Sequence, residues 1–300
     1  MFESLFSSSA LSLERLRTLC SIVESGSIAK AAGYDANTAS LYSRHVKDLQ
    51  QFIGTKLLIR KGKTVQPTAA GLELVSKSQA FFKSLEDMQA STSAGLQRFS
   101  VGAGEAAIYW LIFPRLRNLQ NAYPSACYEF ENLRTSDIHL GLQDSRLDLG
   151  IVRSDTKQKG FEYFDFGTLD FALFVPSSQI SRAPRNPLTL LAKIPLGILM
   201  GSGRFNRELT RSLEAQSIEA QIALRTESFP MLKEALKSQP LAAFLPTPAE
   251  KEMKAHDYRM FRLKGLDFLS VNYSAVYHLG SADIRQSIRH VALKWQKSVT

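Results

Sequence analysis

Residues 27–60 constrain the fold of this chain most, because their apolar side chains recur with helical spacing. Steps of three and four residues separate these side chains, which places them on one face of an α-helix, and we expect that face to be buried. Its members are Ala39, Tyr42, Val46, Leu49 and Ile53. The opposite face is small, polar and basic, and consists of Ser40, Ser43, Arg44, Lys47 and Gln51.

A second, shorter helix is expected just before this one. Ile28, Ala31 and Ala32 form a short apolar pattern that Gly33 ends. Thr38, or Asn37 before it, is a plausible N-cap of the longer helix, because its side chain can accept a hydrogen bond from an unpaired backbone amide. A short helix, a turn and a longer helix with a basic polar face indicate a helix-turn-helix that can enter a DNA major groove.

The flanking segments complete a small domain. Residues 13–25 carry an apolar stripe and predict a packing helix that Gly26 ends. Two short β-like runs surround Lys61, Gly62 and Lys63, which predicts a hairpin with a basic tip that can lie against sugar-phosphate. The alternative for this tip is a solvated turn without a partner.

The distribution of charge favours an anionic partner for this domain. The chain has a formal net charge of +9, and residues 1–70 contribute nine basic and five acidic side chains to it. The charge per residue is therefore higher in this quarter than in the rest of the chain. A generally basic, soluble surface is the alternative, but clustering on the helix and hairpin described above favours phosphate contact.

Residues 13–71 resemble the DNA-binding domain of the LysR-type transcriptional regulators. The resemblance rests on Ala31-Ala32, Ser43-Arg44, Leu49, Gly54, Leu57, Arg60 and Thr68-Ala69-Ala70-Gly71. The chain departs from the family pattern at Asp35, where an apolar residue is usual, and at Ala39-Ser40, where Gln-Pro is frequent. The residues expected to contact double-stranded DNA are Thr38, Ser40, Ser43, Arg44, Lys47, Arg60, Lys61 and Lys63.

A long amphipathic helix is expected over residues 69–96, with Pro67-Thr68 as its cap. Its apolar face includes Leu72, Val75, Gln79, Phe82, Leu85 and Met88. In the family that the chain resembles, the corresponding helix pairs with its twin, so the resemblance implies a homodimer or homotetramer. The alternative is a helix that packs only on its own domain.

Strands and helices alternate from residue 98 onward, which predicts α/β lobes with parallel sheets. The expected helices include one over residues 108–121 and an amphipathic one over residues 282–297. This half resembles the family's effector-binding domain, which has the two-lobed fold of periplasmic solute-binding proteins. The segment Arg-Leu-Asp-Leu-Gly-Ile-Val-Arg at 146–153 is its most specific match. The fold class is therefore α/β, with an α-rich winged helix-turn-helix at the N-terminus and a two-lobed domain of periplasmic-binding-protein type after it.

A ligand of such a fold lies between the lobes, against strand-to-helix turns whose free amides attract anions. The candidate effector-binding residues in three such turns are Gly104, Glu105, Ala106, Ser202, Gly203, Ser228 and Phe229. Glu105 stands where the family often has Ser or Thr to hold a carboxylate, and it would repel one. Each turn is equally compatible with an ordinary connecting loop.

The sequence leaves two other classes of function to consider, a nucleotide-binding enzyme and a solute-binding receptor. Gly102, Gly104 and Ala107 fit a loose dinucleotide fingerprint with Glu129 or Glu131 as the ribose acid, but Pro114 interrupts the helix that should follow. No cofactor, catalytic set or metal site is expected, since the histidines at 45, 139, 256, 278 and 290 are scattered. A solute-binding receptor would need a signal peptide, and the acidic, Ser-rich N-terminus does not match one.

The sequence thus predicts a cytoplasmic, non-enzymatic regulator that binds inverted-repeat DNA under the control of a small-molecule effector. Only Cys20 and Cys127 occur, which fits a reducing compartment, and no apolar run is long enough to span a membrane. The expected organisation is a flexible arm at 1–12, a winged helix-turn-helix domain at 13–70, a linker and dimerisation helix at 71–97, and an effector-binding domain at 98–300.

Overall fold

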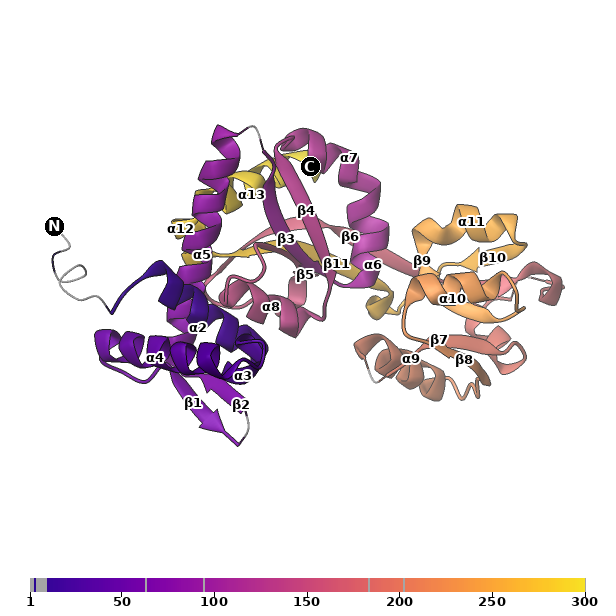
Figure 1. Cartoon of the computed structure of the whole chain (residues 1–300). Coiled ribbons are helices and arrows are strands. Elements are labelled where there is room, and N and C mark those ends of the chain that lie inside the picture. Colours follow the sequence, from indigo (N-terminus) through magenta and orange to yellow (C-terminus); the bar gives the residue numbers. More distant parts are fainter. Residues whose placement is uncertain are drawn as a thin grey trace.

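The computed structural model describes residues 3, 10–62, 64–93, 95–182, 184–201 and 203–299 of the chain, without the side chain of residue 299. Most of the arm expected at 1–12 therefore lies outside the described residues, as do Lys63 and Ser202. Figure 1 shows three parts: a small helical unit with a hairpin, a central lobe and a second lobe at the far side from the hairpin.

The N-terminal unit confirms the predicted helix-turn-helix and hairpin. Its elements are α2 (Leu13–Ser25), α3 (Ile28–Ala31), α4 (Ala36–Ile53), β1 (Leu58–Lys61) and β2 (Thr64–Pro67). Gly26 and Gly54 end α2 and α4 with φ values of 68° and 79°, a conformation that glycine adopts without steric cost. Leu19, Ile22, Val46, Leu49 and Leu57 form the core of the unit.

Helix α5 (Ala69–Thr92) leaves this unit and runs along the central lobe (Figure 1). Thr68 caps it as predicted, because its side chain accepts a hydrogen bond from the amide of Gly71. The helix ends at Thr92, a turn earlier than the predicted residue 96. It packs against the central lobe as well as its own domain, so the alternative of a helix confined to its own domain is wrong.

The central lobe, lobe I, contains one half of a nine-stranded sheet. Eight of its strands follow the order β4-β3-β5-β11-β6-β9-β7-β8, and the ninth, β10, pairs with β6 beside this path. The strands and helices of lobe I are β3 (Gln97–Ala103), α6 (Glu105–Ala107), α7 (Leu116–Ala122), β4 (Ala126–Asn132), α8 (Thr135–Gln143), β5 (Leu149–Arg153), β11 (Ser270–His278), α12 (Leu279–Ile284) and α13 (Gln286–Val299). Strands β3, β4 and β5 are parallel, as predicted, whereas β11 is antiparallel to β5.

Lobe II forms the other half of the sheet. Its elements are β7 (Leu196–Leu199), α9 (Arg204–Ala215), β8 (Ile222–Thr226), α10 (Phe229–Leu236), β9 (Ala242–Pro246), α11 (Glu250–Ala255) and β10 (Tyr258–Phe261). Strand β7 is parallel to β8 and β9. The sequence analysis did not anticipate α11 and β10.

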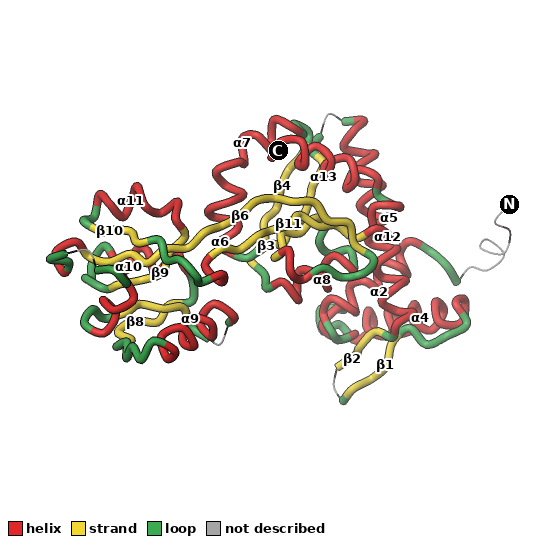
Figure 2. Tube along the Cα trace, turned by 180° about the vertical axis from the view of Figure 1, so that it is seen from behind, coloured by secondary structure: helices red, strands yellow, loops and turns green. Residues whose placement is uncertain are grey.

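One long strand, β6 (Phe161–Pro176), joins the two lobes (Figure 2). Its first part pairs with β11 in lobe I, and its last part pairs with β9 and β10 in lobe II. The chain crosses back before β11, so the C-terminal strand and helices belong to lobe I. These crossing strands make the pairing antiparallel at the centre, which corrects the expectation of purely parallel lobes.

Two predicted helices are interrupted. The helix expected near residues 108–121 consists of α6, a wide π-helical turn at Ile108–Ile112, a tight turn at Phe113–Arg115 and α7. It is interrupted because Pro114 cannot donate the hydrogen bond that a regular helix requires. The helix expected near 282–297 is two helices, α12 and α13, which meet at Arg285.

Arg285 lies at the centre of a buried ion network that fixes α5 to lobe I. Its guanidinium donates to both carboxylate oxygens of Asp87 on α5, at 2.7 and 2.8 Å, and forms an ion pair with Asp148 at 2.8 Å. Lys83 on α5 also contacts Asp148 at 2.9 Å. Arg285 and Asp148 are each only 2% exposed, so these charges depend on one another for compensation.

None of the helices in the described part of the chain is long and apolar enough to cross a bilayer.

Candidate DNA-binding surface and effector cleft

Helix α4 presents the predicted polar face to solvent. Ser40, Ser43, Arg44 and Lys47 are exposed, and Thr38 is half-buried in the first turn. The Ser43 hydroxyl donates to the carbonyl oxygen of Ala39 at 2.9 Å, so its oxygen remains available as an acceptor. Arg44 has no partner among the described residues, and its five donors are free to read an acceptor such as a guanine edge.

The packing of α4 on α2 sets the direction of this face. Val46 and Leu49 are buried against α2, and the buried His45 ring pairs with the Thr18 hydroxyl on α2 at 3.0 Å. Arg15 on α2 also forms an ion pair with Asp48 on α4 at 3.1 Å. These contacts leave the side of α4 that carries Arg44 uncovered within the described structure.

Two details of α4 differ from the prediction. The N-cap is Asp35, not Thr38 or Asn37, and its carboxylate accepts a hydrogen bond from the amide of Thr38 at 2.7 Å. Hydrogen bonds from Thr38, first from its side chain and second from this amide, lower the pKa of Asp35, so the cap is ionised at neutral pH. Ile53, expected in the buried face, is 41% exposed, because the helix ends there and its last turn extends beyond the core.

The hairpin of β1 and β2 lies beside α4 in both views (Figures 1 and 2). Arg60 and Lys61 lie on β1 and are exposed, with Val65 and Thr64 opposite them on β2. The amide of Val65 donates to the carbonyl oxygen of Gly26 at 2.8 Å, which ties the hairpin to the end of α2. Lys63, the other predicted tip residue, lies outside the described residues.

A cleft of about 470 Å³ lies between the two lobes. Aromatic side chains dominate its walls, namely Phe171, Phe205, Phe229, Phe268 and Tyr273. Polar groups enter it from lobe I through Arg153 and Asp155, and from lobe II through Arg204. A mostly apolar cleft with a few convergent polar groups is typical of a small-molecule site.

An ion pair crosses this cleft. Arg153 and Arg204 both contact the same oxygen of Asp155, each at 2.5 Å, although Arg153 ends β5 in lobe I and Arg204 begins α9 in lobe II. The hydrogen bond from Arg153, more than any other interaction, lowers the pKa of Asp155, and Arg204 contributes in the same direction. The cleft therefore contains two guanidinium groups that share one carboxylate.

The predicted effector turns only partly reach the cleft. Ala106 and Phe229 line it, and Gly203 immediately precedes the lining residues Arg204 and Phe205. Gly104 and Glu105 do not line it. Ser228 is buried and caps α10 through a bond from the amide of Met231 at 3.3 Å, while Ser202 is outside the described residues.

None of the three charged cleft residues was predicted from the sequence. Arg153 could have been found, since it ends a buried parallel strand, and ligands meet such sheets at the carboxyl ends of the strands. Phe268 and Tyr273 carry no such signal, because they reach the cleft only through the return of the chain to lobe I.

Of the two glycines of the loose dinucleotide fingerprint, Gly102 has a packing role, whereas a Cβ atom at Gly104 would meet no atom closer than 4.0 Å. A Cβ atom at Gly102 would lie 2.6 Å from the Cδ1 atom of Leu147, so only glycine fits there without a shift. In addition, the described residues contain no cluster of His, Cys, Asp and Glu that could hold a metal ion.

The fold and the two sites define a class of protein: a winged helix-turn-helix joined by a long helix to a two-lobed ligand-binding domain. Residues 13–72 match the bacterial regulatory helix-turn-helix proteins of the lysR family, and residues 95–291 match the LysR substrate binding domain. The chain belongs to the LysR family of transcriptional regulators.

Individual relatives agree with this assignment. The HTH-type transcriptional regulator MetR of Salmonella typhimurium is 28% identical over 161 residues, which are 52% of this chain and 50% of MetR. The chain thus matches about half the length of this curated relative.

Solved structures show the same fold. ArgP from Mycobacterium tuberculosis has a TM-score of 0.67 at 14% identity. The match covers 95% of this chain and 96% of the ArgP chain. Full-length CbnR complexed with its target DNA has a TM-score of 0.60 at 19% identity. The match covers 96% of this chain and 100% of the CbnR chain.

Proposed function

We propose that this protein is a sequence-specific, DNA-binding transcriptional regulator that responds to a small molecule and has no enzymatic activity. The observation that carries the proposal is the exposed face of α4, where Ser40, Ser43 and Arg44 stand free beside the basic hairpin. Arg44 would read base edges, and Lys47, Arg60, Lys61 and Lys63 would contact phosphates. Such a protein acts where the DNA is, in the cytoplasm.

A dimer would place two α4 helices on one duplex. The face of α5 that points away from lobe I exposes Phe81, Leu85 and Met88, with exposed fractions of 40%, 37% and 65%. Their spacing of four and three residues makes one apolar stripe, which a second copy of the helix would cover. A symmetric pair of this kind reads an inverted repeat, so we propose a homodimer or a tetramer built from it.

A gel shift with the DNA immediately upstream of the gene for this protein tests the proposed function. We expect a discrete complex that survives excess random duplex, because specific binding is typically about 10³-fold tighter than non-specific binding or more. Equal competition by random duplex would contradict sequence-specific recognition.

The negative charge at the start of α4 gives a test of how this helix approaches DNA. Asp35→Asn keeps a good N-cap but removes a carboxylate from the end of the helix proposed to approach phosphates. We expect DNA affinity to rise by about two- to fivefold, which corresponds to about 0.5–1 kcal/mol for one exposed like charge. Fluorescence anisotropy against a labelled duplex measures this change.

The control for this variant is Glu214→Gln, which removes an exposed carboxylate from α9 in lobe II, away from α4. It should leave DNA affinity unchanged. If both variants bind DNA more tightly by the same factor, overall net charge, and not the approach of α4, explains the gain.

We also propose that the effector is a small anion with an aromatic or otherwise apolar body. Asp155 places a carboxylate between Arg153 and Arg204, where an acidic ligand group would be held, and aromatic rings line the space beside it. A ligand carboxylate would compete with Asp155 for Arg204, whose contact spans the two lobes. The lobe arrangement would then differ between the free and bound states, which is what control of DNA binding requires.

Substitution of Arg204 tests this effector proposal. Arg204→Ala should weaken binding of an aromatic carboxylate probe such as phenylacetate by about tenfold or more, because a hydrogen bond to a charged group contributes about 1.5–3 kcal/mol. Asp155→Asn should strengthen it, since the competing carboxylate is lost. Isothermal titration calorimetry measures both.

The matched control is Arg211→Ala on the same helix, whose side chain is 71% exposed and pairs with Glu208 instead of entering the cleft. Equal loss of probe affinity in the Arg204 and Arg211 variants would rule out a specific anion site in the cleft.

A further inference from the structure

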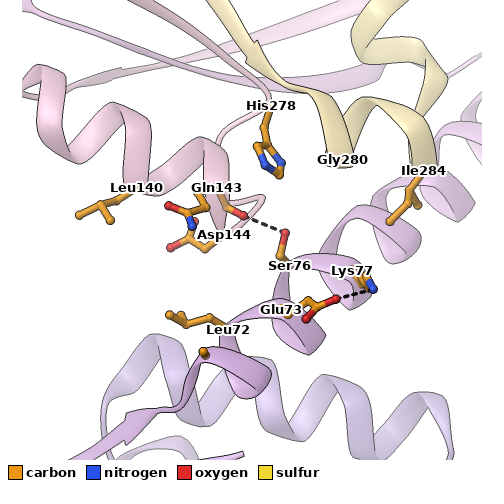
Figure 3. Close-up of a pocket in the computed structure, with 11 residues that line it drawn as sticks. Leu72, Glu73, Ser76, Lys77, Leu140, Gln143, Asp144, His278, Gly280 and Ile284 are labelled. Carbon is orange, nitrogen blue, oxygen red and sulfur yellow. Dashed lines mark hydrogen bonds and ion pairs between the residues drawn. The ribbon is translucent and has the colours of Figure 1, made fainter. Parts of the chain in front are cut away.

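A second cavity, of about 440 Å³, lies far from the interlobe cleft, at the seam between α5 and lobe I. Its walls come from three places in the chain: α5, the end of α8, and the β11–α12 junction (Figure 3). Leu72, Leu140 and Ile284 contribute apolar surface from these three elements, and they are 42%, 58% and 37% exposed. The size is within the range of small-molecule sites.

A chain of hydrogen bonds crosses this seam and ends at His278, whose ring points into the cavity (Figure 3). Ser76 on α5 donates to the carbonyl oxygen of Gln143 at 2.9 Å and is 3.0 Å from the Ser145 hydroxyl. Ser145 is 2.8 Å from the Ser281 hydroxyl, which is 3.1 Å from Nδ1 of His278. Ser145 and Ser281 are 2% and 4% exposed.

The direction of this chain follows from its first bond. A carbonyl oxygen can only accept, so the single proton of Ser76 is used on Gln143. Ser145 must then donate to Ser76, Ser281 to Ser145, and Nδ1 of His278 to Ser281. Burial lowers the pKa of His278, so the ring is neutral at pH 7. Its Nε2 atom therefore carries a lone pair, and no described residue donates to it.

The charged side chains around the cavity favour a ligand that carries positive charge. Glu73 and Asp144 line it, against one lysine, Lys77. Lys77 bonds to Oε1 of Glu73 at 2.7 Å, and no described residue bonds to Oε2 of Glu73. Asp144 is paired with Arg146 at 2.9 Å, and Arg146 does not line the cavity. A bound group that donates hydrogen bonds and carries positive charge would satisfy both Nε2 of His278 and the unbonded Oε2 of Glu73.

We propose that this cavity is a second ligand site, which takes a small organic cation: a primary ammonium group on an apolar body. The ammonium would donate to Nε2 of His278 and lie near Glu73, and the body would cover Leu72, Leu140 and Ile284. Such a ligand contacts α5 and lobe I at once. Binding therefore stabilises the arrangement of α5 and lobe I in which the walls of the cavity lie together, relative to arrangements in which they separate.

Binding of 2-phenylethylamine to the full chain, measured by isothermal titration calorimetry without DNA, tests the proposal. The neutral 2-phenylethanol has the same body and can donate to Nε2, but carries no charge. We expect the amine to bind about tenfold more tightly than the alcohol, and His278→Phe to reduce amine affinity by a similar factor. Glu73→Gln should reduce amine affinity by about two- to fivefold, because Glu73 is largely exposed to solvent. Because DNA is absent, the result does not depend on the proposed function.

Phe205→Ala, which alters the interlobe cleft and not this cavity, is the control and should leave amine affinity unchanged. Thermal melting shows whether each variant is folded, and Glu73→Gln changes an exposed side chain, so it provides a test even if His278→Phe does not fold. The proposal is overturned if the alcohol binds as tightly as the amine, if only Phe205→Ala abolishes binding, or if no saturable binding occurs. Amine affinity that falls as protein concentration rises would show that a second copy covers the cavity, which also overturns it.

Discussion

Replacing Arg285 by alanine is expected to lower the free energy of unfolding by about 3–5 kcal/mol, because it leaves buried carboxylates without their partner. Asp87 and Asp148 are 8% and 2% exposed, and Arg285 contacts both. Lys83 would still compensate Asp148, but Asp87 would keep only the hydroxyl of Ser287. Urea denaturation followed by circular dichroism measures the change, with separate transitions fitted for separate units.

Arg289→Ala is the matched control, since Arg289 lies in α13, four residues after Arg285, and forms an ion pair with Asp283 in which the two side chains are 45% and 67% exposed. Exposed pairs contribute about 0–1 kcal/mol, so this variant should be nearly as stable as the parent chain. A similar, small effect of both substitutions would mean that the network around Arg285 does not hold α5 to lobe I.

Arg44→Ala is expected to remove most of the preference for the operator over random DNA. A side chain that forms two hydrogen bonds to a base edge contributes about 1–3 kcal/mol of discrimination, which is about a 5- to 150-fold loss in specific affinity. Arg44 is exposed and unpaired among the described residues, so its loss should leave the fold intact. Anisotropy titrations with an operator duplex and a random duplex measure the ratio of the two affinities.

Lys61→Ala provides the comparison for Arg44, because Lys61 lies on the hairpin and is expected to contact phosphate only. It should weaken binding to both duplexes alike and reduce the salt slope by about one. The same behaviour is expected of Lys63, as the sequence predicted. Equal losses on operator and random duplex for Arg44→Ala would show that Arg44 contacts the backbone and does not read bases.

The N-terminal unit could be predicted from sequence because its signals are local. The apolar spacing from Ala39 to Leu49 and the stops at Gly26 and Gly54 act within one or two helical turns. The cap of α4 was assigned to Thr38 or Asn37 and belongs to Asp35, an error that arose because several neighbouring polar residues can cap a helix. Such an error shifts a boundary and leaves the exposed face unchanged.

The effector half was predicted as a fold but only partly as a site. The alternation of strands and helices and the segment at 146–153 sufficed for a two-lobed α/β domain. The turns chosen as ligand contacts gave Ala106 and Phe229, whereas Arg153, Asp155 and Arg204 supply the charge in the cleft. Their meeting depends on which strands cross between the lobes, and hydrophobic periodicity contains no such information.

By itself, the sequence determined most of the helices and strands, the apolar faces of the N-terminal helices, and that a basic helix-turn-helix precedes a two-lobed domain. Tertiary structure alone decided where the charged residues end up. Arg285 interrupts the predicted C-terminal helix, lies 198 positions from Asp87 and meets it in the interior. Periodic patterns report a preference for burial one element at a time, whereas the pairing of buried charges depends on strand order and on contacts between distant parts of the chain.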